Sequence, residues 1–229
     1  MAVQGSPGRS PVLRRAGGAV AATLLTLTAA ACGSDPAPYQ FVANSDRTMV
    51  VKLPGSWRAL DPKAVDGPST STSIWSAYFD ASKDPSTDHS QVGAPADTLT
   101  APVARMQTIK LREGAAETLT DDVLRDILLP ASEKGVQRLQ IQAQINVDPD
   151  VRFGALGEEK INTRTGQGLR LAYGYDFGNG MTIREKIVLV DPNRTHLHAI
   201  EISCSPQCFK ANRDEIERVL NSFTVKPLG

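Results

Sequence analysis

The sequence contains few cysteines, few aromatic residues and no apolar run long enough for a membrane-spanning helix, which needs about 20 residues. Only three of its 229 residues are cysteines, and aromatic residues make up 5%. Basic and acidic side chains balance, with 25 of each. The sequence therefore lacks the excess of positive charge that nucleic acid binding requires, and nucleic acid is disfavoured as a partner.

The first 31 residues form a segment of a different character. They contain three arginines and no acidic residue, and residues 16–31 carry no charge. This order is typical of an export signal, and the short apolar run indicates a cleaved leader rather than a membrane span. The pair Arg14-Arg15 leaves the twin-arginine route open, although the small residues that follow favour the general route.

The three cysteines divide into a close pair and a single residue. Cys204 and Cys208 lie in "CSPQC" near the C-terminus, whereas Cys32 directly follows the leader. Export predicts an oxidising compartment, so we expect Cys204 and Cys208 to form a disulfide. Catalytic redox pairs are more often spaced C-x-x-C, which favours a structural staple at a turn for this pair.

Cys32 is then an unpaired thiol at the start of the exported chain. The segment resembles a bacterial lipoprotein signal, in which the cysteine becomes the first residue and carries diacylglycerol on sulfur and an acyl chain, such as palmitate, on nitrogen. The usual motif has leucine where this sequence has Ala29, and "AAA" before Cys32 also suits ordinary signal peptidase, which would cut the same bond. The unpaired thiol favours lipidation of Cys32, and two or more acyl chains make such an anchor stable.

Removing the signal peptide, residues 1–31, removes three basic side chains and no acidic one, so the remaining chain has a net charge near −3. Residues 32–38 are interpreted as the lipidated N-terminus and a short tether, because "GSDPAP" consists of turn-forming residues. Such a tether holds the next residues within ~15 to 20 Å of the membrane surface. We expect one globular domain over residues 39–229, on the extracytoplasmic face of the cell membrane.

The first part of this domain predicts strands, one helix and two long loops. Strands are predicted over 39–43, 48–53, 73–82, 103–111 and 138–147, the last because Leu139, Ile141, Ala143, Ile145 and Val147 alternate with polar residues. A helix is predicted over 118–129, capped by Thr118 or Thr120. Residues 58–73 and 83–102 are predicted to be loops, and Trp57 in "PGSW" is interpreted as a core residue rather than a binding residue.

The C-terminal third predicts an antiparallel meander and a closing helix. Strands are predicted over 158–164, 168–177, 181–190 and 196–203, and the Asn-Gly of "GNG" predicts a tight hairpin between the second and third. The helix over 212–223 has an apolar stripe, and Asn212 and Glu215 have the spacing of a capping box. The predicted fold class is α+β, a single domain with an antiparallel β-sheet flanked by helices.

The order of these elements resembles one known family. Pro-x-x-Trp after the second strand, "GLRLAY" in the meander and the terminal "NSFTV" are similar to the PsbP-like α-β-α sandwich. That fold is shared by extrinsic photosystem proteins, the Mog proteins that bind the Ran GTPase, and actinobacterial lipoproteins of the LpqN type. The resemblance covers residues 39–226 and implies a non-catalytic assembly or binding module. It supplies no catalytic or metal-binding residue.

Signatures of enzymes and metal sites are missing from the sequence. It has neither G-x-S-x-G nor S-x-x-K, so we expect no enzyme and no cofactor. His196 and His198 would share one face of a strand, but a metal site needs further ligands, and Glu201 would point to the other face. Two ordinary strand histidines are favoured, with no metal site, and "DPD" at 148–150 is interpreted as a turn rather than a calcium site.

Two functions from different classes remain. The favoured one is a membrane-anchored accessory, scaffold or binding subunit that docks on an integral membrane or envelope complex. The other is a carrier or sensor for a small apolar ligand or lipid, held between the sheet and a helix or under the 83–102 loop. Its motivation is the aromatic face of Tyr173, Tyr175 and Phe177.

Overall fold

We describe the protein from a computed structural model, which divides into two units, Met1–Ser34 and Asp35–Gly229. The residues described here are 38–66, 74–83, 99–146 and 152–226, all in the second unit. The predicted signal peptide, Cys32, most of the 83–102 loop and "DPD" at 148–150 lie outside them. No helix of the described residues is long and apolar enough to cross a membrane.

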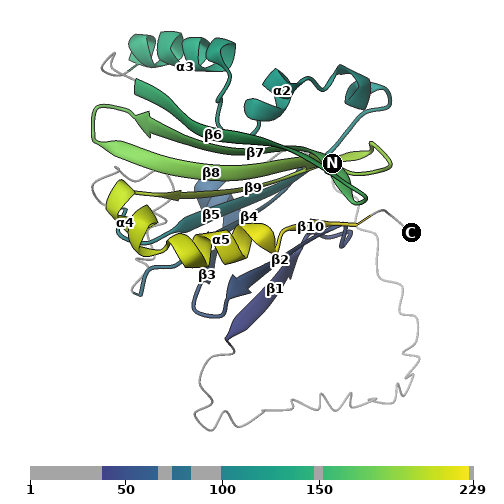
Figure 1. Cartoon of the computed structure of the whole chain (residues 1–229), viewed down its shortest axis with the longest axis horizontal. Coiled ribbons are helices and arrows are strands. Elements are labelled where there is room, and N and C mark those ends of the chain that lie inside the picture. The colour runs from purple at the N-terminus through teal and green to yellow at the C-terminus, as the bar shows by residue number, and fades with distance from the viewer. Residues whose placement is uncertain (1–37, 67–73, 84–98, 147–151, 227–229) are drawn as a thin grey trace, which may run out of the picture. The chain divides into compact units, whose positions relative to one another are not determined.

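The main element is a seven-stranded antiparallel sheet (Figure 1). Its strand order is β3-β4-β5-β9-β8-β7-β6, so the last three strands of the meander follow one another in space. The strands are β3 (Arg58–Leu60), β4 (Ile74–Asp80), β5 (Val103–Lys110), β6 (Arg152–Thr163), β7 (Gly166–Asp176), β8 (Met181–Val190) and β9 (His196–Cys204). Strand β6 is the longest of them and forms one edge of the sheet.

A smaller sheet is formed by the two ends of the domain. Strands β1 (Tyr39–Ala43) and β2 (Met49–Pro54) make an antiparallel hairpin, and β10 (Thr224–Val225) pairs with the other side of β2. The hairpin and its antiparallel pairing are confirmed.

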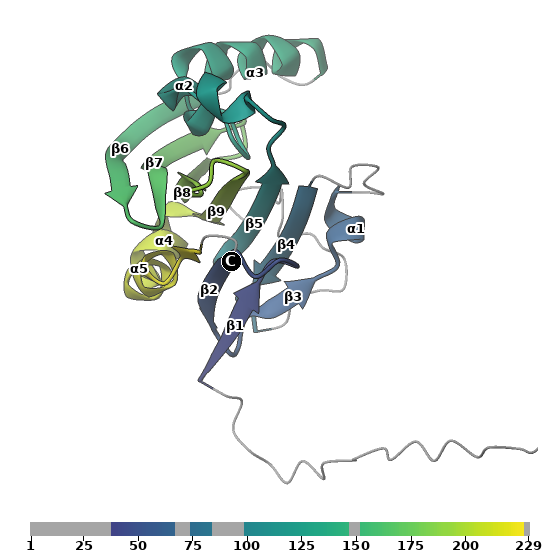
Figure 2. The same ribbon diagram turned by 90° about the vertical axis from the view of Figure 1, so that its right-hand side faces the viewer.

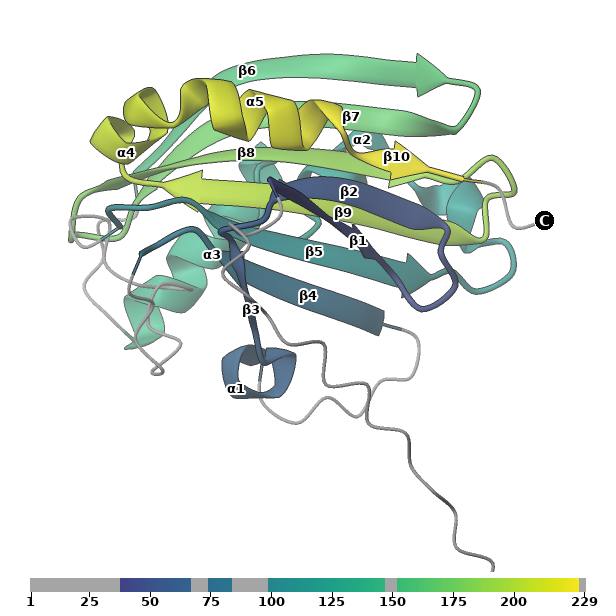
Figure 3. The same ribbon diagram turned by 90° about the horizontal axis from the view of Figure 1, so that it is seen from below.

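The helices lie on both faces of the large sheet. Helices α2 (Asp121–Arg125) and α3 (Glu133–Asn146) cover one face (Figure 2). On the other face, helix α5 (Arg213–Asn221) lies beside the small sheet, and helix α4 (Pro206–Ala211) precedes it and contacts β8 and β9 (Figure 3). A short helix, α1 (Pro62–Asp66), follows β3, and a 3-10 turn spans Ala115–Thr118. The predicted α+β class, with an antiparallel sheet between helices, is confirmed.

Strand alternation divides the core into two apolar clusters, one on each face of the sheet. The cluster on the side of α5 contains Met49, Val51 and Leu53 of β2, Ile200 and Ile202 of β9, and Trp57, which is confirmed as a core residue. The cluster on the other side contains Leu169, Leu171, Tyr173 and Tyr175 of β7 together with Leu124 and Val136. The alternation predicted for β7 therefore places these residues correctly, on a buried face.

The strand predicted over residues 138–147 is wrong, because residues 138–146 belong to helix α3. Val136 and Leu139, three residues apart, reach the core cluster as residues of one helix face do. Ile141, which would share the buried face of a strand with Leu139, is instead 59% exposed. The alternation of apolar and polar residues does not correspond to burial in this segment.

The predicted helix over 118–129 is too long, since α2 ends at Arg125. Thr120 caps its start by accepting a hydrogen bond from the backbone N–H of Val123, as one of the two expected caps. Leu128 has a left-handed backbone (φ 70°), and the carbonyls of Arg125, Ile127 and Leu129 accept hydrogen bonds from the ammonium of Lys186. A helix cannot continue through carbonyls that are turned toward a lysine on the sheet.

Two smaller predictions need correction. Residues 58–73 are not all loop, because β3 pairs with β4 and α1 follows. The capping box of Asn212 and Glu215 is not formed, because Asn212 makes no side-chain cap hydrogen bond and donates to the carbonyl of Cys208 instead. The Glu215 carboxylate accepts a hydrogen bond from the indole N–H of Trp57 (2.9 Å).

Candidate functional site

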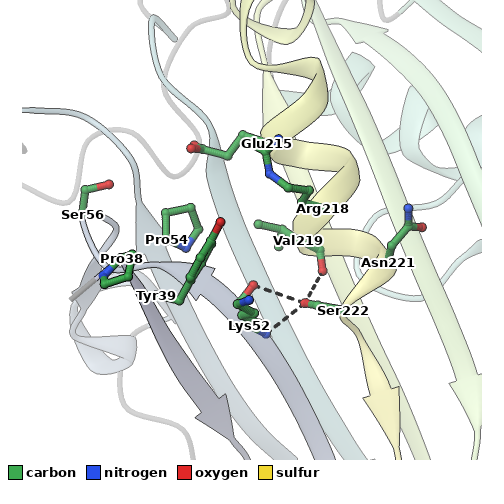
Figure 4. Close-up of a pocket in the computed structure, with 10 residues that line it drawn as sticks. All are labelled: Pro38, Tyr39, Lys52, Pro54, Ser56, Glu215, Arg218, Val219, Asn221 and Ser222. Atoms are coloured by element: carbon green, nitrogen blue, oxygen red, sulfur yellow. Dashed lines mark hydrogen bonds between the residues drawn. The ribbon is translucent and has the colours of Figure 1, made fainter.

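A cleft of about 540 Å³ lies between the β1–β2 hairpin and helix α5 (Figure 4). We call it the hairpin–helix cleft. One wall comes from the hairpin and the turn after it, and the other from the exposed side of α5. The lining residues are Pro38, Tyr39, Lys52, Pro54, Ser56, Glu215, Arg218, Val219, Asn221 and Ser222.

The base of the cleft is held by hydrogen bonds between the hairpin and α5. The Ser222 hydroxyl accepts from the Lys52 backbone N–H (2.9 Å) and lies 3.2 Å from the Lys52 carbonyl, as Figure 4 shows. The indole N–H of Trp57, in the turn after the hairpin, donates to the Glu215 carboxylate of α5. These bonds join segments far apart in the sequence, so both walls keep a fixed separation.

Two cations line this cleft. The Lys52 ammonium lies 3.8 Å from the centre of the Tyr39 ring, a cation–π contact. The Arg218 side chain is exposed and makes no hydrogen bond or ion pair within the described residues. The carboxylate of Glu215 is the one acidic group among the lining residues, and the Trp57 indole holds it in place.

The outward side of the hairpin is apolar, and we call it the hairpin face. Tyr39 and Phe41, two residues apart on β1, are 42% and 74% exposed. Phe41 is paired with Lys52 and Tyr39 with Pro54, so these four side chains share the face. The hairpin face therefore adjoins the cleft, and Tyr39 and Lys52 belong to both.

A second apolar site lies at the edge of the large sheet, and we call it the edge pocket. It has a volume of about 300 Å³ and is lined by Ala131, Phe153, Ala155, Leu156, Gly157, Glu158, Leu171, Ala172 and Tyr173. Leu156 is 60% exposed beside a β-bulge between Ala155 and Gly157. In the described part of the chain, only β7 pairs with β6, which leaves the other side of this strand without a neighbour.

A buried charged network lies on the face of the sheet toward α2. Arg184 forms an ion pair with Glu201 (2.7 Å), and the Tyr173 hydroxyl donates to the same carboxylate. The ammonium of Lys186 is fully buried and uses its three donors on three backbone carbonyls. Burial lowers the pKa of Lys186 to about 8 and raises that of Tyr173. Burial alone would raise the pKa of Glu201, but Arg184 and Lys186 hold it below its ordinary value.

The network connects elements of the fold. Lys186 ties the segment after α2 to the sheet, and Arg184 supplies the ion pair of a buried carboxylate. Perturbed pKa values accompany structural ion pairs as well as active sites. Lys186 and Glu201 line neither the hairpin–helix cleft nor the edge pocket.

The two histidines share a face of β9, as predicted. Their imidazole rings are stacked with centroids 5.9 Å apart. His196 and His198 each place Nδ1 within 3.0 Å of a threonine hydroxyl, from Thr195 and Thr108 respectively. Glu201 lies on the opposite face, and no group of three or more metal-ligating side chains occurs among residues 38–66, 74–83, 99–146 and 152–226.

The other predicted site residues fall into three groups. Cys204 and Cys208 form a disulfide that joins the end of β9 to α4, with their Cα atoms 5.6 Å apart. Tyr173 and Tyr175 are buried core residues, while Phe177 lies beyond β7 and stacks on Tyr175. Cys32 lies outside the described residues, so its lipidation stays a prediction.

Sequence reasoning missed Lys52, Arg218 and Lys186. The signal for the hairpin face was present in "YQFVA", because a strand with apolar residues on both of its sides exposes one of them unless something covers it. Lys186 stands in the otherwise apolar "KIVLV". The cleft itself has no sequence signal, because its two walls come from distant parts of the chain. Lys52 on one wall and Arg218 on the other are 166 positions apart in the sequence.

Comparison with known proteins gives similar folds at low sequence identity. No family model matches the chain, and no curated protein does. The solution structure of cyanobacterial PsbP from Synechocystis is similar over 85% of this chain and 96% of its own, with 14% identity and a TM-score of 0.48. The Ran-binding protein Mog1p of Saccharomyces cerevisiae has 9% identity, covers 82% and 95%, and gives a TM-score of 0.43.

A third similar structure is LpqN of Mycobacterium tuberculosis, described as involved in cell envelope biogenesis. It has 11% identity, covers 82% of this chain and 91% of its own, and gives a TM-score of 0.42. These three proteins are of the kinds that the sequence motifs resemble. The likeness concerns the fold, a single α+β domain built on an antiparallel sheet.

Proposed function

We propose that this protein is a lipid-anchored extracytoplasmic protein whose domain acts as a non-catalytic accessory subunit of a membrane or envelope complex. The leader and Cys32 supply the motive for the anchor. The observation that supports the binding role is the edge pocket beside β6. A free strand edge next to an apolar pocket is the arrangement used in β-augmentation, where an extended partner segment adds a strand and places a side chain in the pocket.

Strand β6 also carries charges that oppose unspecific pairing. Glu158 is bound by Arg125 and Lys160 by Asp121, so both side chains are fixed at the edge of the sheet. Charged side chains on an edge strand discourage pairing between identical copies. The partner segment would therefore need an apolar residue opposite Leu156 and charges that complement Glu158 and Lys160.

Photo-crosslinking in native membranes tests this function. A photoreactive amino acid replaces Leu156 in the full-length chain, and a matched control carries it at exposed Lys210 on α4. We expect one dominant adduct with an integral membrane or envelope protein from position 156 and none from position 210. Recovery of the uncrosslinked monomer alone from both positions would rule out the edge pocket as the docking site.

The edge pocket also favours a second function, the carrier or sensor of a small apolar ligand. Its volume lies at the lower end of the range for ligand sites, and Phe153, Leu171 and Tyr173 give it apolar walls. Native mass spectrometry of the purified protein would then show a bound lipid that the substitution Leu156→Asp, at an exposed lining position, removes. A mass that corresponds to the protein alone would count against this function.

A further inference from the structure

We propose that the hairpin face and the hairpin–helix cleft form a second membrane contact, in which the face enters the lipid interface and the cleft binds the phosphate of an anionic phospholipid. This inference rests on the lipid anchor of the proposed function. It assigns anionic phospholipids to the cleft as its ligand class, and it gives the anchored domain a fixed orientation on the membrane.

The hairpin face has the composition of a membrane-interface surface. Its outward positions on β1 are Tyr39, Phe41 and Ala43, and those on β2 are Val50, Lys52 and Pro54. No carboxylate occurs at these positions, so no acidic side chain would have to be desolvated against lipid. Phe41 exposes most of its ring, which water solvates poorly and a lipid interface accepts.

Tyr39 and Lys52 have the amphipathic form that suits the boundary between lipid and water. Aromatic rings with a polar end gather at the level of the headgroups, and a lysine can bury its stem while its ammonium reaches the phosphates. The ammonium of Lys52 is held 3.8 Å from the Tyr39 ring, at the rim where the face meets the cleft. The contact with Tyr39 fixes the position of the Lys52 ammonium, and so sets how deep in the lipid interface a phosphate would meet it.

The cleft supplies the second cation and polar donors. Arg218 faces Lys52 across the cleft and makes no hydrogen bond or ion pair in the described part of the chain. The hydroxyl of Ser56 and the side chain of Asn221 lie on the same lining. With the Glu215 carboxylate on the same lining, Lys52 and Arg218 leave the cleft one net positive charge, which matches the single negative charge of a phosphodiester, and its several oxygens can accept from the neighbouring donors.

The position of the cleft in the chain favours a membrane lipid over a free phosphate. Pro38 lines the cleft and lies six residues after Cys32, so an extended tether keeps this wall within ~20 Å of the anchor. A free phosphate would use Lys52 and Arg218 but would leave Phe41 exposed to water. The phospholipid accounts for both the cations and the apolar face.

Quenching by brominated acyl chains tests the inference. The full lipidated chain is reconstituted into vesicles of phosphatidylcholine and phosphatidylglycerol, with a fluorescent label on Ala43→Cys or, as the control, on Glu159→Cys of β6. We expect brominated lipid to quench the label at 43 and to leave the label at 159 bright. Equal quenching at both positions, or none at 43, would overturn the membrane contact.

Substitutions in the cleft test the headgroup site. The double substitution Lys52→Gln and Arg218→Gln should lower the ratio of membrane-bound hairpin to free hairpin by roughly 25-fold. Each basic side chain near an anionic surface raises this ratio roughly fivefold. Lys110→Gln with Arg112→Gln removes the same charge from exposed positions at the end of β5 and should change nothing. Equal effects of the two pairs would overturn a specific headgroup site.

Two further measurements separate the possible failures. Inorganic phosphate at matched ionic strength should leave the quenching at 43 unchanged. If phosphate abolished this quenching, the cleft would bind free phosphate rather than lipid. Flotation with the vesicles reports the anchor independently. A protein that floats without quenching at 43 contradicts the second contact alone, whereas a protein that does not float contradicts the anchor on which the proposed function depends.

Discussion

At the scale of single residues, His198 makes the stability of the domain sensitive to acid. Its ring is fully buried in β9, and burial lowers its pKa to about 4 from an ordinary value of 6.5. The unfolded chain therefore binds this proton first as the pH falls, and stability that is complete above pH 6.5 is lost progressively toward pH 4. The expected loss in the free energy of unfolding between pH 7 and pH 5 is about 2 kcal/mol.

Urea unfolding of the wild type and of His198→Gln at both pH values checks this expectation. The variant can keep a hydrogen bond to the hydroxyl of Thr108 but cannot take up the proton. Any constant cost of the substitution cancels in the comparison of the two pH values. If the variant lost as much stability in acid as the wild type, another group would be responsible.

Lys186 is predicted to be the lysine whose loss costs most stability among those with an assigned partner. Replacing it by Met leaves the carbonyls of Arg125, Ile127 and Leu129 without a donor and should lower the free energy of unfolding by about 3 kcal/mol. Lys160→Met on the neighbouring β6 breaks an exposed ion pair with Asp121 and should cost less than 1 kcal/mol. Similar losses from the two substitutions, measured by urea unfolding, would contradict the role given to Lys186.

At the scale of elements, the disulfide joins strand β9 to helix α4. It closes a loop of five residues, and such a short loop stabilises the folded state by about 2 kcal/mol in the chain-entropy model. The double substitution Cys204→Ser and Cys208→Ser should lower the free energy of unfolding by about this amount and increase hydrogen exchange in α4. Unfolding measurements under oxidising and reducing conditions provide the control, because the reducing agent should affect only the wild type.

The sequence predicts elements well where burial and period agree. The strands β7, β8 and β9 are predicted correctly because turn residues separate them; buried positions alternate along β7, whereas β9 is buried at nearly every position. The sequence of α3 predicts a strand because its apolar residues alternate with polar ones, whereas in the helix Val136 and Leu139 lie on one face and reach the core. Helix α2 is short because the buried ammonium of Lys186, on a distant strand, donates to backbone carbonyls at its end and just after it. No local pattern in the sequence reveals this effect.

The candidate surfaces were less predictable than the fold. The disulfide follows from spacing and compartment, which are properties of the sequence. The hairpin–helix cleft depends instead on how α5 packs beside β2, and the edge pocket depends on which strand ends the sheet. Both are consequences of tertiary packing, so their residues could be assigned only after Lys52 and Arg218, or Leu156 and Tyr173, had been placed in space.

At the scale of the whole molecule, the chain separates into Met1–Ser34 and the compact unit Asp35–Gly229. The core of the described residues is formed within the second unit alone, from Met49 near its start to Val225 near its end. The attachment of the domain to the membrane and its folding should therefore be independent properties. The substitution Cys32→Ser separates them, because it removes the atom that would carry diacylglycerol.

We expect Cys32→Ser to move the protein from the membrane fraction to the soluble fraction without changing the urea midpoint of the domain. The hairpin face should not retain it, because a contact of a few side chains is weak beside an anchor of two or more acyl chains. Intact mass of the mature N-terminus provides the matched measurement, with acyl chains on Cys32 in the wild type and none in the variant. A wild-type protein that is soluble and unacylated would show that ordinary signal peptidase processes the leader, and the domain would then have to find its partner by diffusion.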